Sequence, residues 1–151
     1  MRFLWLGLAI AGPVVLTLVI LTVVFAAIRR SIAREAATLE GVVRDSGPIK
    51  VTTRFRRFRS ARVYRGGGIR VTPAQLVLTA THLHVLERPQ LYGRFKREDL
   101  ARFTVGVLDG RLHLFSKDPP DASGEIDYRF RVDDPETWAG VLADAGAKRA
   151  A

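Results

Sequence analysis

No charged residue occurs between Arg2 and Arg29, and the intervening run from Phe3 to Ile28 is almost entirely apolar. As an α-helix rising about 1.5 Å per residue, this run is roughly 39 Å long, which exceeds the ~30 Å hydrocarbon core of a bilayer. A chain of 151 residues is too small to bury a helix that is apolar on every side. The run therefore predicts a membrane anchor, residues 1–30, that crosses the bilayer once.

A cleaved secretory signal is the alternative to a retained anchor. Such a signal has an apolar stretch of about 7–15 residues behind a positively charged start. Here the stretch is far longer, and only Arg2 and the amino terminus precede it. A small-residue cleavage pattern does occur at 24–26, but Arg29 and Arg30 would follow the cut, which disfavours export. We therefore expect the anchor to stay in the mature protein.

The charges that flank the anchor predict its orientation. Arg29, Arg30 and Arg34 follow the apolar run, with Arg44 a little further on, whereas only Arg2 and the α-amine precede it. Because lysine and arginine concentrate on the cytoplasmic side of a span, we expect the larger, carboxyl-terminal part in the cytoplasm. The absence of cysteine excludes disulfides, thiolate metal sites and cysteine nucleophiles, and it fits this compartment.

Residues 31–47 predict a helical connector between the anchor and a domain. Ile32, Ala36 and Leu39 recur three or four residues apart, so the helix is expected to continue for two or three turns beyond the membrane. The Ser-Gly-Pro sequence at 46–48 is expected to break it. The segment is too short for the several heptads of a coiled coil, which favours a spacer over a dimerisation element.

From Ile49 the hydrophobic period changes to two, which is typical of half-buried strands. The first strand, 49–55, has Lys50 and Arg54 on its polar face, and a bulge or turn is expected at Arg57-Phe58. Pro73 confines its own stretch to a sheet edge or a bend, and Asp109-Gly110 between apolar alternations predicts a hairpin. Further strands are expected at 61–65 (ended by the glycines 66–68), 69–71, 76–78, 83–86, 103–108, 112–115 and 125–132.

The chain closes with an amphipathic helix. Asp133 or Asp134 is a suitable N-cap, and Pro135 suits the first helical position. Trp138 and Leu142 belong to one apolar face, and Gly146 can end the helix. About seven strands followed by one helix predict a mainly β fold for residues 48–151, a curved sheet or barrel capped by the carboxyl-terminal helix.

Two stretches resemble the bacterial pleckstrin-homology-like domains. These are LVLTATHLHVLERP (Leu76–Pro89) and GRFKREDLARFTV (Gly93–Val105), and the resemblance extends over roughly Ile49 to Ala147. In that family a Leu-Thr turn joins two strands, and a short charged segment precedes a further strand pair. Many such bacterial proteins carry spanning helices beside the domain. The resemblance implies a binding or scaffolding module in the bacterial inner membrane, without identifying a ligand.

Binding is most strongly indicated by basic residues in the first strands. Eight lysines and arginines occur between Asp45 and Glu87 with no acidic residue among them, which predicts a strong local field. Eukaryotic lipid-binding members of the fold use basic residues of the first hairpin, although this spacing does not reproduce a phosphoinositide signature. Anionic lipid headgroups, a membrane protein or a second copy of the chain are the expected partners, against the alternative of a solvated strand face. The candidate binding residues are Arg54, Arg56, Arg57, Arg59, Arg62 and Arg65.

Other function classes receive less support from the residues. Phe55, Phe58 and Tyr64 are interleaved with arginines as stacking platforms for nucleic acid would be, but Phe55 fits the inward phase of its strand, the other two fit a core equally well, and the chain is anchored. His82, His84 and His113 allow a metal site, and a membrane-displayed metal-dependent or small-ligand enzyme is the alternative function. No nucleophile, base and orienting acid can be assembled, so we expect a non-catalytic protein without cofactor, catalytic residues or metal.

Overall fold

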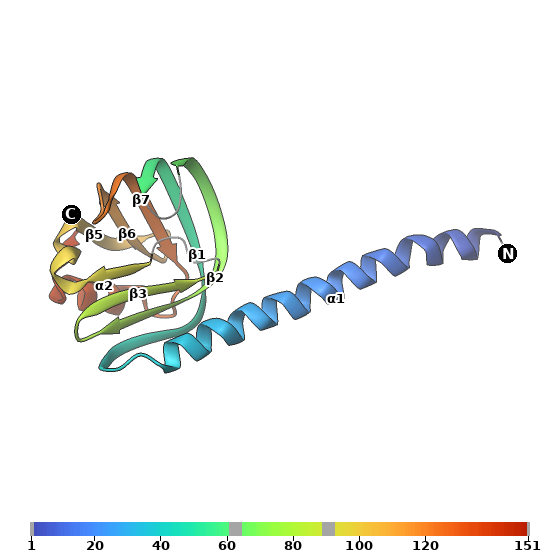
Figure 1. The fold of residues 1–151 in the computed structure, drawn as a ribbon, viewed down its shortest axis with the longest axis horizontal. Helices are drawn as coiled ribbons and strands as arrows, with labels where there is room; N and C mark the ends of the chain where they lie inside the picture. The colour runs from blue at the N-terminus through green and yellow to red at the C-terminus, as the bar shows by residue number, and fades with distance from the viewer. Residues whose placement is uncertain (1, 61–64, 89–92, 151) are drawn as a thin grey trace.

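The computed structural model describes residues 2–60, 65–88 and 93–150, and for residues 2–11 and 65 it describes the backbone alone (Figure 1). A long helix, α1 (Arg2–Ala37), precedes the sheet. The elements that follow are β1 (Val42–Ser60), β2 (Arg65–Thr79), β3 (His82–Glu87), β4 (Arg94–Lys96), the 3-10 helix η1 (Arg97–Arg102), β5 (Phe103–Leu108), β6 (Arg111–Lys117), β7 (Ala122–Phe130), α2 (Pro135–Asp144) and β8 (Lys148–Arg149).

In the described part of the chain the strands form one curled sheet in the order β4-β3-β2-β1-β7-β6-β5-β8. All neighbouring strands are antiparallel except β5 and β8, which are parallel. The sheet consists of two meanders, β1 to β4 and β5 to β7, joined where β1 pairs with β7. The curled sheet and the carboxyl-terminal helix confirm the mainly β half-barrel expected from the sequence.

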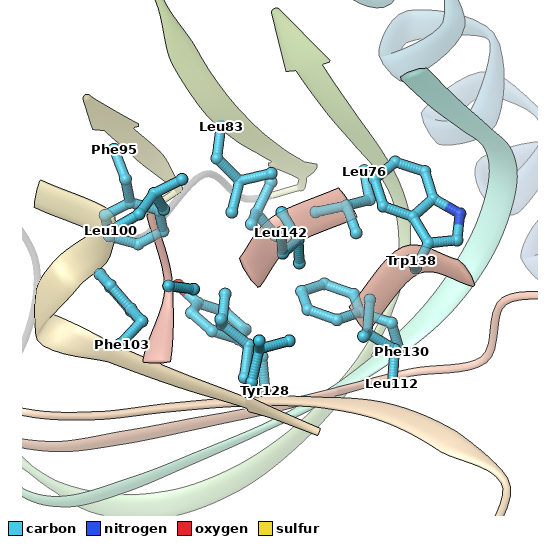
Figure 2. Packing of buried hydrophobic residues seen from close by; sticks show 14 of the residues in the cluster. Leu76, Leu83, Phe95, Leu100, Phe103, Leu112, Tyr128, Phe130, Trp138 and Leu142 are labelled. Atoms are coloured by element: carbon cyan, nitrogen blue, oxygen red, sulfur yellow. The ribbon is translucent and has the colours of Figure 1, made fainter. Parts of the chain in front are cut away.

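The inner face of the sheet and α2 enclose the main hydrophobic core (Figure 2). Trp138 and Leu142 of α2 point into the cluster that contains Leu76 and Phe130. Asp134 begins α2 as expected, because its carboxylate accepts a hydrogen bond from the Thr137 backbone N–H at 3.2 Å. The core therefore fills the inside of the half-barrel, and the outer face of the sheet is left for other contacts.

The end of α1 packs against the outer face of the sheet. Ile32 and Ala36 contact Val77 of β2 and Leu86 of β3, and Ile28 flanks this second cluster. An ion pair at 2.8 Å joins Glu35 Oε2 of α1 to Nη2 of Arg88, the residue after β3. By contrast, the most apolar stretch of the helix within Gly12–Ala37 is not buried against the described part of the protein, and the helix is long and apolar enough to cross a membrane.

The expected helical connector is wrong beyond Ala37, since a turn leads directly into β1 at Val42. The Ser-Gly-Pro sequence lies inside β1, where the register with β2 shifts between Asp45 and Pro48. Side chains at this irregularity pair with β2: Gln75 Nε2 donates to the Asp45 carboxylate at 2.8 Å, and the Leu76 N–H donates to Ser46 Oγ at 2.9 Å. These long-range bonds stabilise a strand where local signals indicated a break.

The expected turn at the glycines 66–68 is also wrong, because β2 runs through them to Thr79. Four residues of the strand expected at 61–65 lie outside the described residues. Other turn signals are confirmed. Residues 66–73 of β2 pair with β1 alone among the described strands, so Pro73 does lie on a sheet edge. Asp109 and Gly110 both have positive φ, 52° and 67°, as a two-residue hairpin requires.

Candidate binding surface on the outer face of the sheet

Strand β1 separates apolar and basic residues between the two faces of the sheet. Val51, Thr53 and Phe55 are buried on the inner face. Because successive side chains of a strand alternate, Lys50 and Arg54 lie on the outer face. The confirmed two-residue period thus places the basic residues of this strand away from the core.

A bulge after Phe55 exposes two arginines in succession. The register of β1 shifts between Phe55 and Phe58 relative to β2, and Arg57 has a positive φ of 49°. Phe58 returns to the core, whereas Arg56 and Arg57 are both exposed. Opposite them, Gly124 has a φ of 93°, and a Cβ there would lie 2.3 Å from the Arg57 carbonyl oxygen. A glycine at 124 is therefore required for the bulge, as expected for a close backbone approach.

The structure brings part of the expected basic site together. Arg56, Arg57 and Arg59 are exposed at one end of β1, and Arg54 is half-buried nearer its middle. Arg65 begins β2 and pairs with Arg59 in the backbone register; its side chain is outside the description. Arg62 lies outside the described residues.

Counter-charges come from β7, a strand distant in sequence. In the register, Arg54 faces Asp127 and Arg56 faces Glu125. Asp127 Oδ1 lies 3.0 Å from His113 Nε2 and 3.6 Å from Arg129 Nε. The expectation that the basic residues have no acidic neighbours is therefore wrong for the middle of β1, although it was right for the local sequence. A shallow hollow of about 150 Å³ lies over this mixed charge, lined by Arg54, Arg56, Phe115, Glu125, Asp127 and Arg129.

The electrostatics of Asp127 show that this part of the face is balanced. Burial opposes ionisation of the carboxyl, but the nearby side chains of His113 and Arg129 outweigh it and lower the pKa of Asp127. The carboxylate is thus charged at neutral pH and offsets Arg54 and Arg129. Arg59 faces Ser123 and not a carboxylate in the register, so the exposed Arg57 and Arg59 at the end of β1 are better placed to attract an anion than Arg56, which faces Glu125.

Two exposed apolar side chains lie beside the basic residues. Ile69 and Val71 of β2 are 66% and 64% exposed, more than any other large apolar residue described outside α1. They face Arg54 and Thr52 across the β1–β2 pairing, so they share the outer face. The alternation from Ile69 to Val71 is visible in the sequence. Which face of the sheet the two side chains lie on depends on the pairing of β2 with β1, which the sequence did not reveal.

A second polar group lies on the inner face near the open edge of β2. Thr72 Oγ1 donates a hydrogen bond to Glu87 Oε2 at 2.9 Å, and Glu87 is almost fully buried. Burial raises the pKa of Glu87, against the smaller opposite effects of the Thr72 hydrogen bond and the Arg70 charge. The local sequence gave no sign of this buried carboxyl, because Glu87 follows a strand whose partners are distant.

The histidines are distributed over separate surroundings. His82 and His84 are neighbours, with ring centroids 5.7 Å apart, while His113 belongs to the Asp127 cluster on β6. Leu83 and Val85 are buried on the inner face of β3, and His84 is also buried, on its outer face. Burial is the main cause that lowers the pKa of both His82 and His84, and Arg94 adds to it. Within the residues that the structure describes, no group of three potential metal ligands is found.

No family model and no curated protein matches this chain. Its class is therefore defined by structure alone: a curled, mainly β sheet with a carboxyl-terminal helix, behind an apolar helix long enough to cross a membrane.

Proposed function

We propose that this protein is a membrane-anchored, non-catalytic binding module of the pleckstrin-homology-like kind, which contacts anionic lipid headgroups through the exposed arginines of β1. α1 crosses the bilayer once, and the domain lies on the cytoplasmic side, in keeping with Arg29, Arg30 and Arg34 at that end of the helix. The inner membrane of a bacterium is the proposed location.

The arrangement of the elements supports the proposed family. Two antiparallel meanders joined through β1, with a closing helix that inserts Trp138, fit the pattern that the sequence resembles. In such a module the sheet is a scaffold, and function resides in what its surface binds.

The observation that carries the proposal is the location of the exposed arginines on a domain packed against its own anchor. Arg56, Arg57 and Arg59 are exposed together at the bulge. Each basic residue near an anionic membrane surface contributes about 1 kcal/mol of attraction. Because the anchor already holds the domain at the membrane, even this modest free energy favours a docked state.

The experiment uses the full chain in lipid nanodiscs of phosphatidylcholine, with or without phosphatidylglycerol. A single cysteine at Ser123, an exposed residue that faces Arg59, carries a fluorophore. Lipid-borne quenchers should quench it more in anionic than in neutral discs, and high salt should abolish the difference. Replacing Arg57 and Arg59 with glutamine should lower the docking constant about 30-fold, from ~1 kcal/mol per charge.

The matched control replaces Lys148 and Arg149, exposed on β8, with glutamine, which removes the same formal charge elsewhere. The proposal is wrong if anionic lipid does not increase quenching, or if both double variants reduce it equally. Loss of lipid dependence, combined with a protein that co-purifies from solubilised membranes, would instead support a membrane-protein partner.

A further inference from the structure

We infer that the outer face of the β1–β2 pair lies against the bilayer that α1 crosses, with Ile69 and Val71 inserted among the lipid headgroups. This inference rests on the proposed function and adds an orientation and an apolar contact to it. The occupant of the exposed apolar pair is thus the lipid surface itself.

The packing of α1 places the membrane boundary next to this face. Ile28 is the last residue of the charge-free run, and it already packs against the cluster formed with Val77 and Leu86 on the outer face of the sheet. The apolar part of the helix therefore begins where the helix leaves the sheet. In Figure 1, α1 extends away from the side of the sheet on which β1 and β2 lie. A bilayer around α1 must consequently approach that side.

Ile69 and Val71 lie on the same strand face as the helix contact. Val77 and Val71 are separated by six residues of β2, or about 20 Å at 3.3 Å per residue. This distance is small compared with the extent of a membrane surface beside the helix. Because the two side chains are more than 60% exposed, their transfer from water to the interface is favourable.

Basic residues accompany the apolar pair. Arg54 faces Ile69 in the register, and the exposed Lys50 faces Pro73. Asp127, one strand further, offsets Arg54 in part. Apolar side chains flanked by cations are typical of surfaces that lie in the interface of anionic membranes.

The open edge of β2 offers a competing explanation for the exposure. Residues 66–73 pair only with β1 among the described strands, so this part of β2 is the edge at which a strand of a second copy would add. Such pairing would depend on the number of chains per disc, whereas contact with lipid would not. This difference separates the two explanations.

The test uses the full chain in phosphatidylcholine–phosphatidylglycerol nanodiscs that hold one chain each. Since the chain has no cysteine, single cysteines at Ile69, Val71 and Leu108 carry an environment-sensitive fluorophore. Leu108, 40% exposed at the β5–β6 hairpin, is the matched apolar control. We expect a quencher in the upper acyl chain to quench the labels at 69 and 71 at least threefold more strongly than the label at 108.

A second pair of variants guards against effects of the label. Ile69→Asp combined with Val71→Asp should reduce quenching of a label at Ser123, whereas Leu108→Asp should leave it unchanged. Equal quenching at 69, 71 and 108, in discs where anionic lipid still increases the quenching of the label at Ser123, would overturn this inference and leave the proposed function standing. If anionic lipid does not increase the quenching at Ser123 either, both fail. Stronger quenching at 69 and 71 than at 108 that occurs only in discs with two chains would also overturn the inference, in favour of a second copy.

Discussion

Replacing Gly124 with alanine tests whether the bulge that exposes Arg56 and Arg57 depends on close backbone approach. The φ of 93° at Gly124 costs a residue with a side chain about 1–2 kcal/mol. The new Cβ would also lie 2.3 Å from the Arg57 carbonyl oxygen and 2.8 Å from that of Arg56. Relief of this clash requires the backbone to move, because both contacts are with main-chain atoms.

That movement endangers two hydrogen bonds. The Asp118 N–H donates to the Gly124 carbonyl at 2.7 Å, and the Gly124 N–H donates to Asp118 Oδ1 at 2.8 Å. At about 1 kcal/mol each, their loss brings the expected total to about 3–4 kcal/mol. Gly110→Ala is the matched control, since Gly110 has a φ of 67° but nothing within 4 Å of its Cβ position. It should cost only about 1–2 kcal/mol in total, the same cost for its φ without the loss of the two hydrogen bonds.

Denaturant unfolding of the detergent-solubilised chain measures both costs. A Trp5→Phe background leaves Trp138, buried in the core, as the single tryptophan reporter. The difference of about 2 kcal/mol between the variants corresponds to about 8–16 °C in Tm for a domain of this size. Equal destabilisation by Gly124→Ala and Gly110→Ala would show that the bulge does not depend on the close backbone approach at Gly124.

Three further predictions concern stability. Glu87→Gln should stabilise the protein at pH 7, because burial raises the pKa of Glu87 in the folded state. The contribution of this carboxyl to the free energy of unfolding is complete below its unfolded pKa near 4.5 and is lost as the pH rises through the folded pKa. Unfolding titrations from pH 4 to 8 should show no such decline in the variant. His84 acts oppositely, because its lowered pKa keeps the native imidazole neutral; stability from this group is complete above about pH 6.5 and falls below it. His84→Gln should therefore lose less stability than the wild type between pH 7 and 5, measured by the same denaturant titration. Gly140→Ala, in α2 with open space around the Cβ position, should raise the unfolding free energy by about 0.5–1 kcal/mol in the Trp138 assay, and a decrease would contradict the helix-propensity argument.

Local patterns in the sequence were sufficient for much of the fold. The charge-free run, the alternation of β5 to β7, the Asp109-Gly110 hairpin and the cap at Asp134 are determined by neighbours in sequence, and each is confirmed. The helical connector was wrong because residues from Val42 onward form a strand that β2 stabilises. The hydrogen bonds from Gln75 and Leu76 to residues 45 and 46 join residues that are 30 positions apart in the sequence. A single sequence does not show such bonds.

The expectation that the basic residues have no acidic neighbours was wrong for a related reason. The stretch around Arg54 has no acidic residue nearby in sequence, but the register places Asp127 of β7 opposite it. Strand pairing brings together charges from segments some 70 residues apart, and the sequence pattern gives the face of each strand without its neighbour. The exposure of Arg56, Arg57 and Arg59 at an expected irregularity is the part that local reasoning did anticipate.

The junction between α1 and the sheet has a mechanical consequence. The helix is continuous from Arg2 to Ala37, and its last turns are clamped on Val77 and Leu86, so little slack separates it from the domain. When α1 rotates about its long axis, the half-barrel must rotate with it through the same angle. Shifting a lateral helix–helix contact by one residue changes the azimuth of the helix by about 100°. The position at which a neighbouring transmembrane helix contacts α1 would thereby determine which side of the half-barrel faces that neighbour.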